Sequence, residues 1–226
     1  MSEWLSFFQN ALPEFLNGAL VTLELTLVGV GMGFVLGMLA ALGRVYGRPW
    51  MRALSVGYIE LFRGTPLLVQ LFLVYYGLPG IGVTLDRMPS AFLALSLNSG
   101  AYQAEYLRGA ILAIGEGQMM AGRAIGMSRW KTIFFIILPQ ALRLAIPAWA
   151  NEPVSLLKST AVAFLIAVPD LMTKAKAVAS RTYDPIGSYL AVAVVYLVMV
   201  FILDYGLKYL EKTTRIPGFA MEEKKA

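Results

Sequence analysis

The residues best suited to chemistry lie in one short stretch, Asn-Glu-Pro-Val-Ser-Leu-Leu-Lys-Ser-Thr, at 151–160. Glu152 and Lys158 fall there within a long apolar region, where charge is costly and marks a pathway, an ion pair or an interfacial end. The two residues are six apart across Pro153, so an ideal helix would not place them on one face. We expect at least one of them to contact a polar ligand. The alternatives are mutual neutralisation and an interfacial position.

Two other pairs of opposite charges fall inside apolar regions. Glu60 and Arg63 are three residues apart, as are Glu105 and Arg108, which places each pair on one helical face. Charges so placed can partly neutralise each other. Both pairs are therefore predicted to be structural ion pairs.

The elements that position these residues must be membrane helices. Of the 226 residues, 58% are hydrophobic and only 15% are charged, whereas soluble domains average about half apolar and a quarter charged. Each crossing needs roughly 20 apolar residues, and five apolar regions are visible: 18–43, 53–78, 90–114, 132–168 and 187–207. The sequence predicts an all-α, polytopic fold of five transmembrane helices. We expect one domain, 1–226, with its core at 18–207 and a tail at 208–226.

The distribution of Lys and Arg predicts the orientation. If the N-terminus lies outside, the inner segments hold eleven of these residues and the outer segments four. Cytoplasmic loops carry the excess of positive charge. We therefore predict a multi-pass protein of the cell (inner or plasma) membrane, with the N-terminus outside and the C-terminus in the cytoplasm. The same distribution accounts for the net charge of +5, and no nucleic-acid partner is expected.

The apolar region 132–168 is too long for one straight crossing, since 37 residues would extend about 55 Å as a helix. Pro139, Pro147 and Pro153 each remove a backbone donor within it. Non-helical backbone at membrane depth is found only inside protein or beside a wet cavity. We predict that the chain unwinds near 151–160 and that a cavity lies there.

A series of glycines marks one face of the first apolar region. Gly29, Gly33 and Gly37 are spaced four apart, which is typical of close packing between membrane helices. Packing within one subunit and contact with a second subunit are both consistent with this spacing.

The stretch 117–130, Gly-Gln-Met-Met-Ala-Gly-Arg-Ala-Ile-Gly-Met-Ser-Arg-Trp, separates two apolar regions. It is predicted to be a short helix that ends with Gly126 at the C′ position, followed by a helix capped by Ser128. An interfacial helix lying on the headgroups is one interpretation. Small residues hold a lipid surface poorly, however, and Ala121, Gly122 and Gly126 would let another protein approach closely.

Several chemistries are excluded by composition. The chain has no cysteine and no histidine, which removes thiol nucleophiles, disulfides, cysteine or histidine metal sites and an imidazole proton shuttle. No metal site is expected. A Gly-Lys dipeptide is also absent, so the phosphate loop G-x-x-x-x-G-K-[ST] does not occur. The chain is not expected to hydrolyse ATP by that route.

The run from Met120 to Ala141 resembles the signature loop of permeases of ATP-binding-cassette importers. That signature reads Glu-Ala-Ala, three residues, Gly, nine residues, then Ile-x-Leu-Pro, and this chain has Ala121, Gly126, Leu138 and Pro139 at those spacings. Further matches are Glu-Leu-Phe-Arg-Gly-Thr-Pro-Leu-Leu-Val-Gln at 60–70, Leu-Asn-Ser-Gly-Ala-Tyr-Gln-Ala-Glu-Tyr-Leu-Arg-Gly-Ala at 97–110 and the stretch at 151–160. Together they resemble the polar amino-acid uptake branch of the family, over nearly the whole chain.

The resemblance implies a transport subunit without enzyme activity or a cofactor of its own. The loop 115–131 would hold a cytoplasmic coupling helix inserted into a separate ATPase, with contacts from Gly117, Met120, Ala121, Gly122 and Gly126. Met120 stands where the family has glutamate and Gly122 where it has alanine, which puts one polar contact in doubt. The implied partners are two ATPase subunits that bind ATP and Mg, a second permease subunit (a copy or a close paralogue), and an extracytoplasmic amino-acid-binding protein.

The resemblance also implies an amino-acid zwitterion as cargo, which needs acceptors for its ammonium and donors for its carboxylate. Glu152 and the carbonyls of Leu67 and Asn98 are the predicted ammonium contacts. The predicted carboxylate contacts are Lys158, Ser159, Thr160 and nearby backbone N–H groups. In relatives an aspartate often stands where this chain has Ser159, and some of those relatives carry cationic substrates, so glutamine, glutamate or another polar amino acid is favoured over a cationic one.

Two rival functions remain open at this stage. An ion-coupled secondary transporter would use Glu105 or Glu152 as a proton or sodium ligand and would need no ATPase. A membrane scaffold or sensor subunit would use residues 117–126 to dock a signalling partner. Uptake driven by ATP rather than by an ion gradient would separate the leading hypothesis from both.

Overall fold

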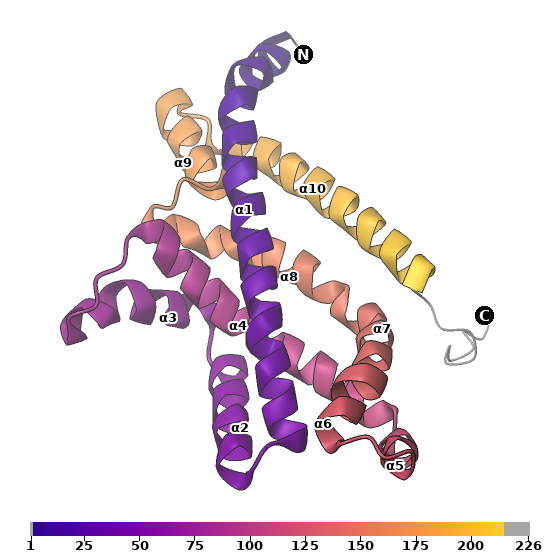
Figure 1. Cartoon of the computed structure of the whole chain (residues 1–226). Helices are drawn as coiled ribbons and strands as arrows, with labels where there is room; N and C mark the ends of the chain where they lie inside the picture. Colours follow the sequence, from indigo (N-terminus) through magenta and orange to yellow (C-terminus); the bar gives the residue numbers. More distant parts are fainter. Residues whose placement is uncertain (1, 215–226) are drawn as a thin grey trace.

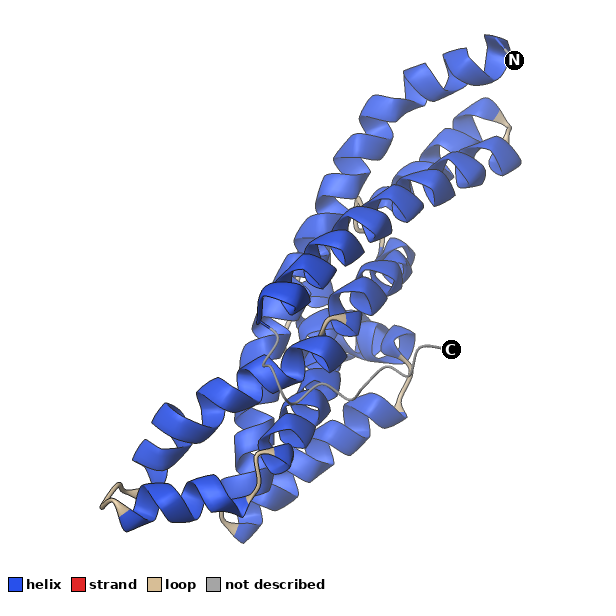
Figure 2. Cartoon of the chain, turned by 90° about the vertical axis from the view of Figure 1, so that its right-hand side faces the viewer, coloured by secondary structure: helices blue, strands red, loops and turns tan. Residues whose placement is uncertain are grey.

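The computed structural model describes residues 2–214, and all regular elements in that range are helices (Figure 2). The prediction of an all-α fold is confirmed for this part of the chain. Three helices are long and apolar enough to cross a membrane, at Ala11–Tyr46, Arg129–Trp149 and Pro185–Thr214. Two bent helix pairs bring the number of candidate spans to as many as five.

Helix α1 (Ser2–Tyr46) extends along the whole bundle and packs lengthwise against α4 (Arg87–Ala113) (Figure 1). The glycine face makes this packing possible. A Cβ on Gly33 would lie 3.0 Å from the backbone nitrogen of Gly100, and one on Gly37 would lie 2.8 Å from the carbonyl of Gly100. The glycines at 33 and 37 therefore serve contacts within the chain.

The second apolar region does not form one straight helix. It divides into α2 (Pro49–Gly64) and α3 (Leu67–Phe72), which meet at 107° when α3 is taken with its short continuation, the π-helix Leu73–Gly77 and the 3-10 helix Leu78–Ile81. The bend falls at Pro66, which has no N–H to donate to the carbonyl of Phe62 one turn earlier. The buried Gln70 side chain donates to that carbonyl instead, at 2.8 Å. A side-chain donor thus takes the place of the backbone N–H that the proline removes.

Helix α4 lies at the centre of the bundle, and about half of its residues are buried. A larger share of its residues is polar than in the other two long helices, α1 and α10, and it is not among those that pass as spans by composition. Its buried polar side chains include Ser96, Asn98, Ser99 and Gln103. Among the three long helices, the one that is least apolar in sequence is therefore the one most enclosed by protein.

The fourth apolar region is broken, as predicted, but the predicted position of the break was wrong. After α5 (Glu116–Ala124), the chain continues through α6 (Arg129–Thr132), the π-helix Ile133–Ile137, α7 (Leu138–Trp149), α8 (Asn151–Ser159) and the 3-10 helix Thr160–Ile166. Residues 151–159 are helical because Pro153 falls in the first turn of α8, where its missing N–H has no helical acceptor in any case. The extended backbone instead comes after Ala167, which adopts a left-handed φ of 55°.

The chain then turns into α9 (Leu171–Thr182), 53° away from the helix before the break, and ends in α10 (Pro185–Thr214). The Asp170 carboxylate caps α9 by accepting from the backbone N–H of Thr173 at 2.9 Å. The predicted tail from residue 208 is helical up to Thr214, and its remainder, 215–226, lies outside the described residues.

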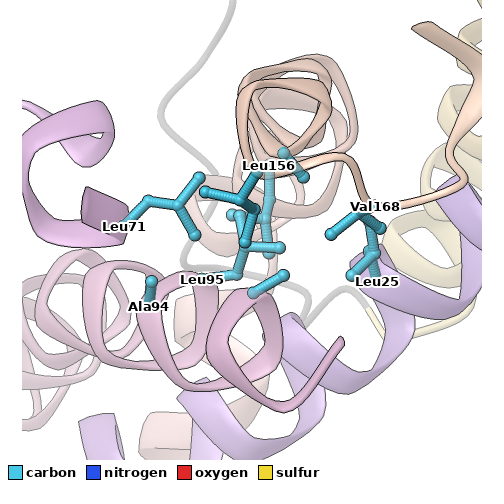
Figure 3. Packing of buried hydrophobic residues seen from close by; sticks show 9 residues of the cluster. Leu25, Leu71, Ala94, Leu95, Leu156 and Val168 are labelled. Carbon is cyan, nitrogen blue, oxygen red and sulfur yellow. The ribbon is translucent and has the colours of Figure 1, made fainter. Parts of the chain in front are cut away.

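A buried apolar cluster fixes the middle of the bundle. It joins Leu25 of α1, Leu71 of α3, Leu95 of α4, Leu156 of α8 and Val168 of the extended connection (Figure 3). Elements far apart in the sequence are thereby held side by side. This core positions α8, and with it Glu152, against α4.

Candidate functional site

The Glu152 carboxylate lies deep in the bundle, with 5% of the residue exposed. It accepts a hydrogen bond from the hydroxyl of Ser99 on α4 at 2.8 Å. Within the described residues, no salt bridge neutralises it. A carboxylate held by one hydroxyl in an apolar interior is a strong candidate to bind a cation.

Ser99 belongs to a buried chain of hydrogen bonds centred on Gln103, which is fully buried. The Gln103 amide donates to Ser99 Oγ and to the carbonyl of Val30, both at 3.0 Å. Its oxygen accepts from the indole N–H of Trp149 at 2.7 Å. Gln103 therefore ties α4 to α1 and α7 and fixes the hydroxyl that holds Glu152.

A second polar group lies beside the first, because Asn98 precedes Ser99 on α4. The Asn98 amide donates to Gln70 Oε1 at 3.0 Å and to the carbonyl of Phe62 at 3.3 Å. These contacts connect the α2–α3 bend to α4. Leu67 is the first residue of α3, directly after the bend, and packs at the edge of the apolar core.

The structure does not bring Lys158 to Glu152. Lys158 is exposed, and no ion pair joins the two within the described part of the chain. The Ser159 hydroxyl donates to the carbonyl of Ser155 at 2.9 Å, and the Thr160 hydroxyl donates to that of Leu157 at 2.7 Å. Both hydroxyl protons are therefore used within the helix, and Thr160 is fully buried. The predicted contacts thus separate into Glu152 with Asn98 inside the bundle and Lys158 at the surface.

Only one of the two predicted ion pairs is formed. Arg108 binds Glu105 at 2.7 Å, and Arg44 of α1 contacts the same carboxylate. Among the described residues, no salt bridge joins Glu60 to Arg63, and the prediction of that pair was wrong. Both side chains are exposed, and the Arg63 guanidinium lies over the ring of Tyr102, 5.4 Å from its centroid. An aromatic face on α4 provides a partner that the spacing along α2 could not predict.

The second candidate region is the short helix α5, at the end of the bundle that also holds the α1–α2 turn (Figure 1). Its predicted C-terminal end and the predicted cap of the next helix are confirmed. Gly126 has a left-handed φ of 83°, and the N–H of Met127 closes on the carbonyl of Gly122 at 3.0 Å. Ser128 caps the next helix by accepting from the N–H of Lys131. The helix is therefore held in a fixed position by its own turn.

The small residues of α5 divide into two groups. Gly117, Ala121 and Gly126 are exposed, and a Cβ added to either glycine would meet nothing within 4 Å. Gly122 is buried, and a Cβ there would lie 2.5 Å from Cγ2 of Thr132 on α6. The prediction that Gly122 lets another protein approach was wrong, because its missing side chain makes room for the neighbouring helix of the same chain.

Two large apolar side chains complete the exposed face of α5 and its turn. Met120 is 65% exposed and Ile125 is 76% exposed. Beside them, a cavity of about 430 Å³ opens between α5 and the ends of α1 and α4, with Met119, Met120, Glu116, Tyr46 and Arg129 among its lining residues. Two exposed apolar side chains next to a partly apolar cavity form a surface that a protein partner can cover.

Sequence reasoning missed four residues of the buried polar network: Gln70, Ser99, Gln103 and Trp149. Ser99 and Gln103 carried a usable signal, since polar residues four apart in an apolar helix share one face. Gln70 and Trp149 carried none, because their partners lie on other helices.

The fold and these two regions define a polytopic membrane protein with an internal polar site and a short helix, α5, that exposes apolar side chains at one end of the bundle. A family model, the binding-protein-dependent transport system inner membrane component, matches residues 33–216. The L-cystine transport system permease protein TcyB of Bacillus subtilis is 41% identical over 206 residues, covering 90% of this chain and 88% of the relative. The glutamine transport system permease protein GlnP of Escherichia coli is 35% identical, covering 95% of this chain and 98% of the relative.

Solved structures agree with these relatives. The crystal structure of an amino acid ABC transporter with histidines aligns with a TM-score of 0.84 at 35% identity, covering 93% of this chain and 98% of that chain. The inward-facing MetNI methionine ABC transporter aligns with a TM-score of 0.75 at 18% identity, which supports the fold alone. This chain belongs to the family of inner-membrane permease components of binding-protein-dependent ABC transporters. The predicted permease function is confirmed, and neither rival is supported.

Proposed function

We propose that this chain is the permease subunit of an ATP-driven importer for polar amino acids. The observation that carries the proposal is the pairing of a buried carboxylate site with an exposed docking helix, joined by one helical rod. The rod runs from the cap at Ser128 through α6 and α7 to Trp149, whose indole holds Gln103. Movement of α5 would therefore be transmitted to the hydrogen bonds around Glu152.

The proposed assembly contains two copies of an ATPase, which bind ATP and Mg, and a second permease subunit. An extracytoplasmic binding protein would deliver the cargo. The permease forms one domain over 1–226, with five crossings, the N-terminus outside and α5 in the cytoplasm as the coupling helix. Gly117, Met120, Ala121 and Gly126 would contact the ATPase, with Ile125 added by its exposure. The chain itself would carry no cofactor and perform no catalysis.

Glu152 and Asn98 are the proposed inner contacts for the ammonium group of the cargo, and Leu67 would add its carbonyl at the α2–α3 bend. Lys158, which is exposed on α8, would bind the carboxylate, and Ser159 would join it after its hydroxyl leaves the carbonyl of Ser155. Relatives named for L-cystine and glutamine transport support a polar amino acid as the cargo. The serine at 159 favours such a substrate over a cationic one.

Uptake into proteoliposomes tests the proposal. The permease is reconstituted with the ATPase with which it co-purifies, and uptake of radiolabelled glutamine and cystine is measured in the presence of the binding protein. We expect uptake only when ATP is present on the side of the membrane where the ATPase is bound. A non-hydrolysable ATP analogue on that side should give no uptake. Uptake driven by a sodium or proton gradient in vesicles that lack the ATPase would contradict the proposal.

A further inference from the structure

Three arginines from three helices converge on a cavity that the proposed transport cycle does not use. The cavity measures about 210 Å³ and is lined by Arg44 of α1, Arg52 of α2, Arg108 of α4 and two apolar residues. This volume is several times the roughly 30 Å³ that a water molecule occupies in the liquid. It lies at the same end of the bundle as α5, because Val45 and Leu112 also line the cavity beside α5.

The arginines are held in place by the packing around them. Arg108 binds Glu105 through two of its nitrogens, and Arg44 contacts the same carboxylate. Their side chains are only 29% and 23% exposed. Two fixed guanidinium groups in defined positions suit an oxyanion, because bidentate geometry adds specificity to charge.

The turn between α1 and α2 brings the third arginine to the others. A Cβ on Gly43 would lie 2.5 Å from Ser55 Oγ, and one on Gly47 would lie 2.9 Å from Cβ of Met51. The two glycines therefore let the first turns of α2 approach the end of α1. Arg52, which lies in those turns, comes to line the cavity as a result.

The charges in the cavity do not balance. Arg44 and Arg108 share the single carboxylate of Glu105, Arg52 adds a third positive charge at an exposed position, and no acidic side chain lines the cavity in the described part of the chain. Arg44 and Arg108 are partly buried and together carry one positive charge more than Glu105 neutralises, and such an excess is costly unless an anion compensates it. The missing partner is therefore a group with one or two negative charges.

Apolar surface beside the cavity distinguishes a lipid from a free anion. Val45 and Leu112 form part of its wall. Trp50 and Leu54 lie two residues before and after Arg52 on α2 and are 60% and 67% exposed. An exposed tryptophan next to arginines is typical of the boundary between hydrocarbon and headgroups. Basic cavities between membrane helices near the headgroups bind phosphate-bearing lipid headgroups.

We infer that the cavity formed by Arg44, Arg52 and Arg108 binds the phosphate headgroup of an anionic phospholipid. This site is separate from the proposed amino-acid site and does not depend on the identity of the cargo. The lipid would neutralise the excess charge and hold the α1–α2 turn against α4.

Native mass spectrometry of the purified, delipidated full-length permease tests the inference. The protein is titrated with phosphatidylglycerol, phosphatidylethanolamine or inorganic phosphate. The variant Arg52→Gln removes the arginine that is not tied to Glu105, and Arg48→Gln removes an exposed arginine four residues away that does not line the cavity. We expect preferential binding of phosphatidylglycerol, weakened about fivefold by Arg52→Gln and unchanged by Arg48→Gln.

Three results would overturn the inference. Equal binding of the two lipids would show that the headgroup charge is not recognised. Equal losses from the two variants would show that surface charge alone attracts the lipid. Displacement of phosphatidylglycerol by inorganic phosphate at similar concentration would assign the cavity to a free anion. Since the measurement needs neither ATPase nor amino acid, any of these outcomes leaves the proposed transport function standing.

Discussion

The buried network around Glu152 and the exposed helix α5 use polar and small residues in opposite ways. Inside the bundle, Ser99, Gln103 and Trp149 satisfy one another's hydrogen bonds and hold a single carboxylate. On α5, Met120 and Ile125 expose apolar surface that nothing in the described chain covers. The network is satisfied within one chain apart from a counter-charge for the carboxylate, whereas in the proposed assembly a partner covers the apolar face of α5. Substitutions in the two regions should therefore have different effects: those on α5 should impair ATP-driven uptake, and those at the buried carboxylate should impair the response to cargo.

The largest effect on transport is expected from Gly126→Leu. A leucine at a φ of 83° is strained by about 1–2 kcal/mol and adds bulk to the proposed contact surface. ATP-driven uptake should fall by more than about tenfold while membrane insertion is unchanged. Gly82→Leu is the matched control, because Gly82 also has a left-handed φ, of 86°, and open space around it but lies after the 3-10 helix Leu78–Ile81. Equal losses in the two variants would show that the turn has no special role.

Replacement of Glu152 should act on the response to cargo. Glu152→Gln keeps the hydrogen bond to Ser99 but removes the charge, so substrate-stimulated ATP hydrolysis should fall by about tenfold. Basal hydrolysis should remain. In Lys158→Gln, where the side chain is exposed, the loss should be smaller. A parallel loss of basal and stimulated hydrolysis in Glu152→Gln would indicate a structural role instead.

An intermediate effect is expected where α5 packs on its own chain. Gly122→Ala puts a methyl group 2.5 Å from Cγ2 of Thr132, so α5 must tilt and uptake should fall by about threefold. Thr132→Ala removes the obstructing atoms, and the double variant should recover. If the double variant is no better than Gly122→Ala alone, the contact with Thr132 is not what Gly122 serves.

The smallest effect on transport, and the clearest effect on stability, is expected at the α2–α3 bend. Gln70→Leu leaves the carbonyl of Phe62 with Asn98 as its remaining side-chain donor, which should destabilise the chain by about 1–3 kcal/mol. Thermal unfolding in detergent measures this loss. Arg63→Gln, at an exposed stacking contact, is the control and should change stability by less than about 1 kcal/mol.

The parts that sequence could predict were those governed by local rules. The end of α5 at Gly126 and the cap at Ser128 followed from the residues themselves. The position of the break after Ala167 did not, because Pro153 was tolerated in the first turn of a helix. Contacts between different helices could not be predicted from the sequence either. Nothing near Arg63 in the sequence shows that Tyr102 is its neighbour. Likewise, nothing near Pro66 shows that the Phe62 carbonyl accepts hydrogen bonds from Gln70 and Asn98.

The candidate site could likewise be predicted only in part. Glu152 could be selected from its charge in an apolar region, and the structure places it deep in the bundle. The hydrogen bonds that hold it come from α4, and those that hold Ser99 come from Gln103. Sequence identified the charged residue but not the neighbours that orient it, since these depend on how four helices pack.

The central claim is that protein, not lipid, covers α5 in the working transporter. Because the chain has no cysteine, Met120→Cys gives one thiol on the exposed face of that helix. The rate at which a water-soluble maleimide labels this thiol is measured in membranes from which the ATPase has been stripped, and again after the ATPase is restored. The reference variant is Tyr183→Cys, because Tyr183 is 92% exposed. The account predicts rapid labelling without the ATPase and strong protection with it, while labelling at 183 is unaffected by the ATPase. Labelling at 120 that is equally slow in both states, and that rises only when lipid is removed, would contradict it.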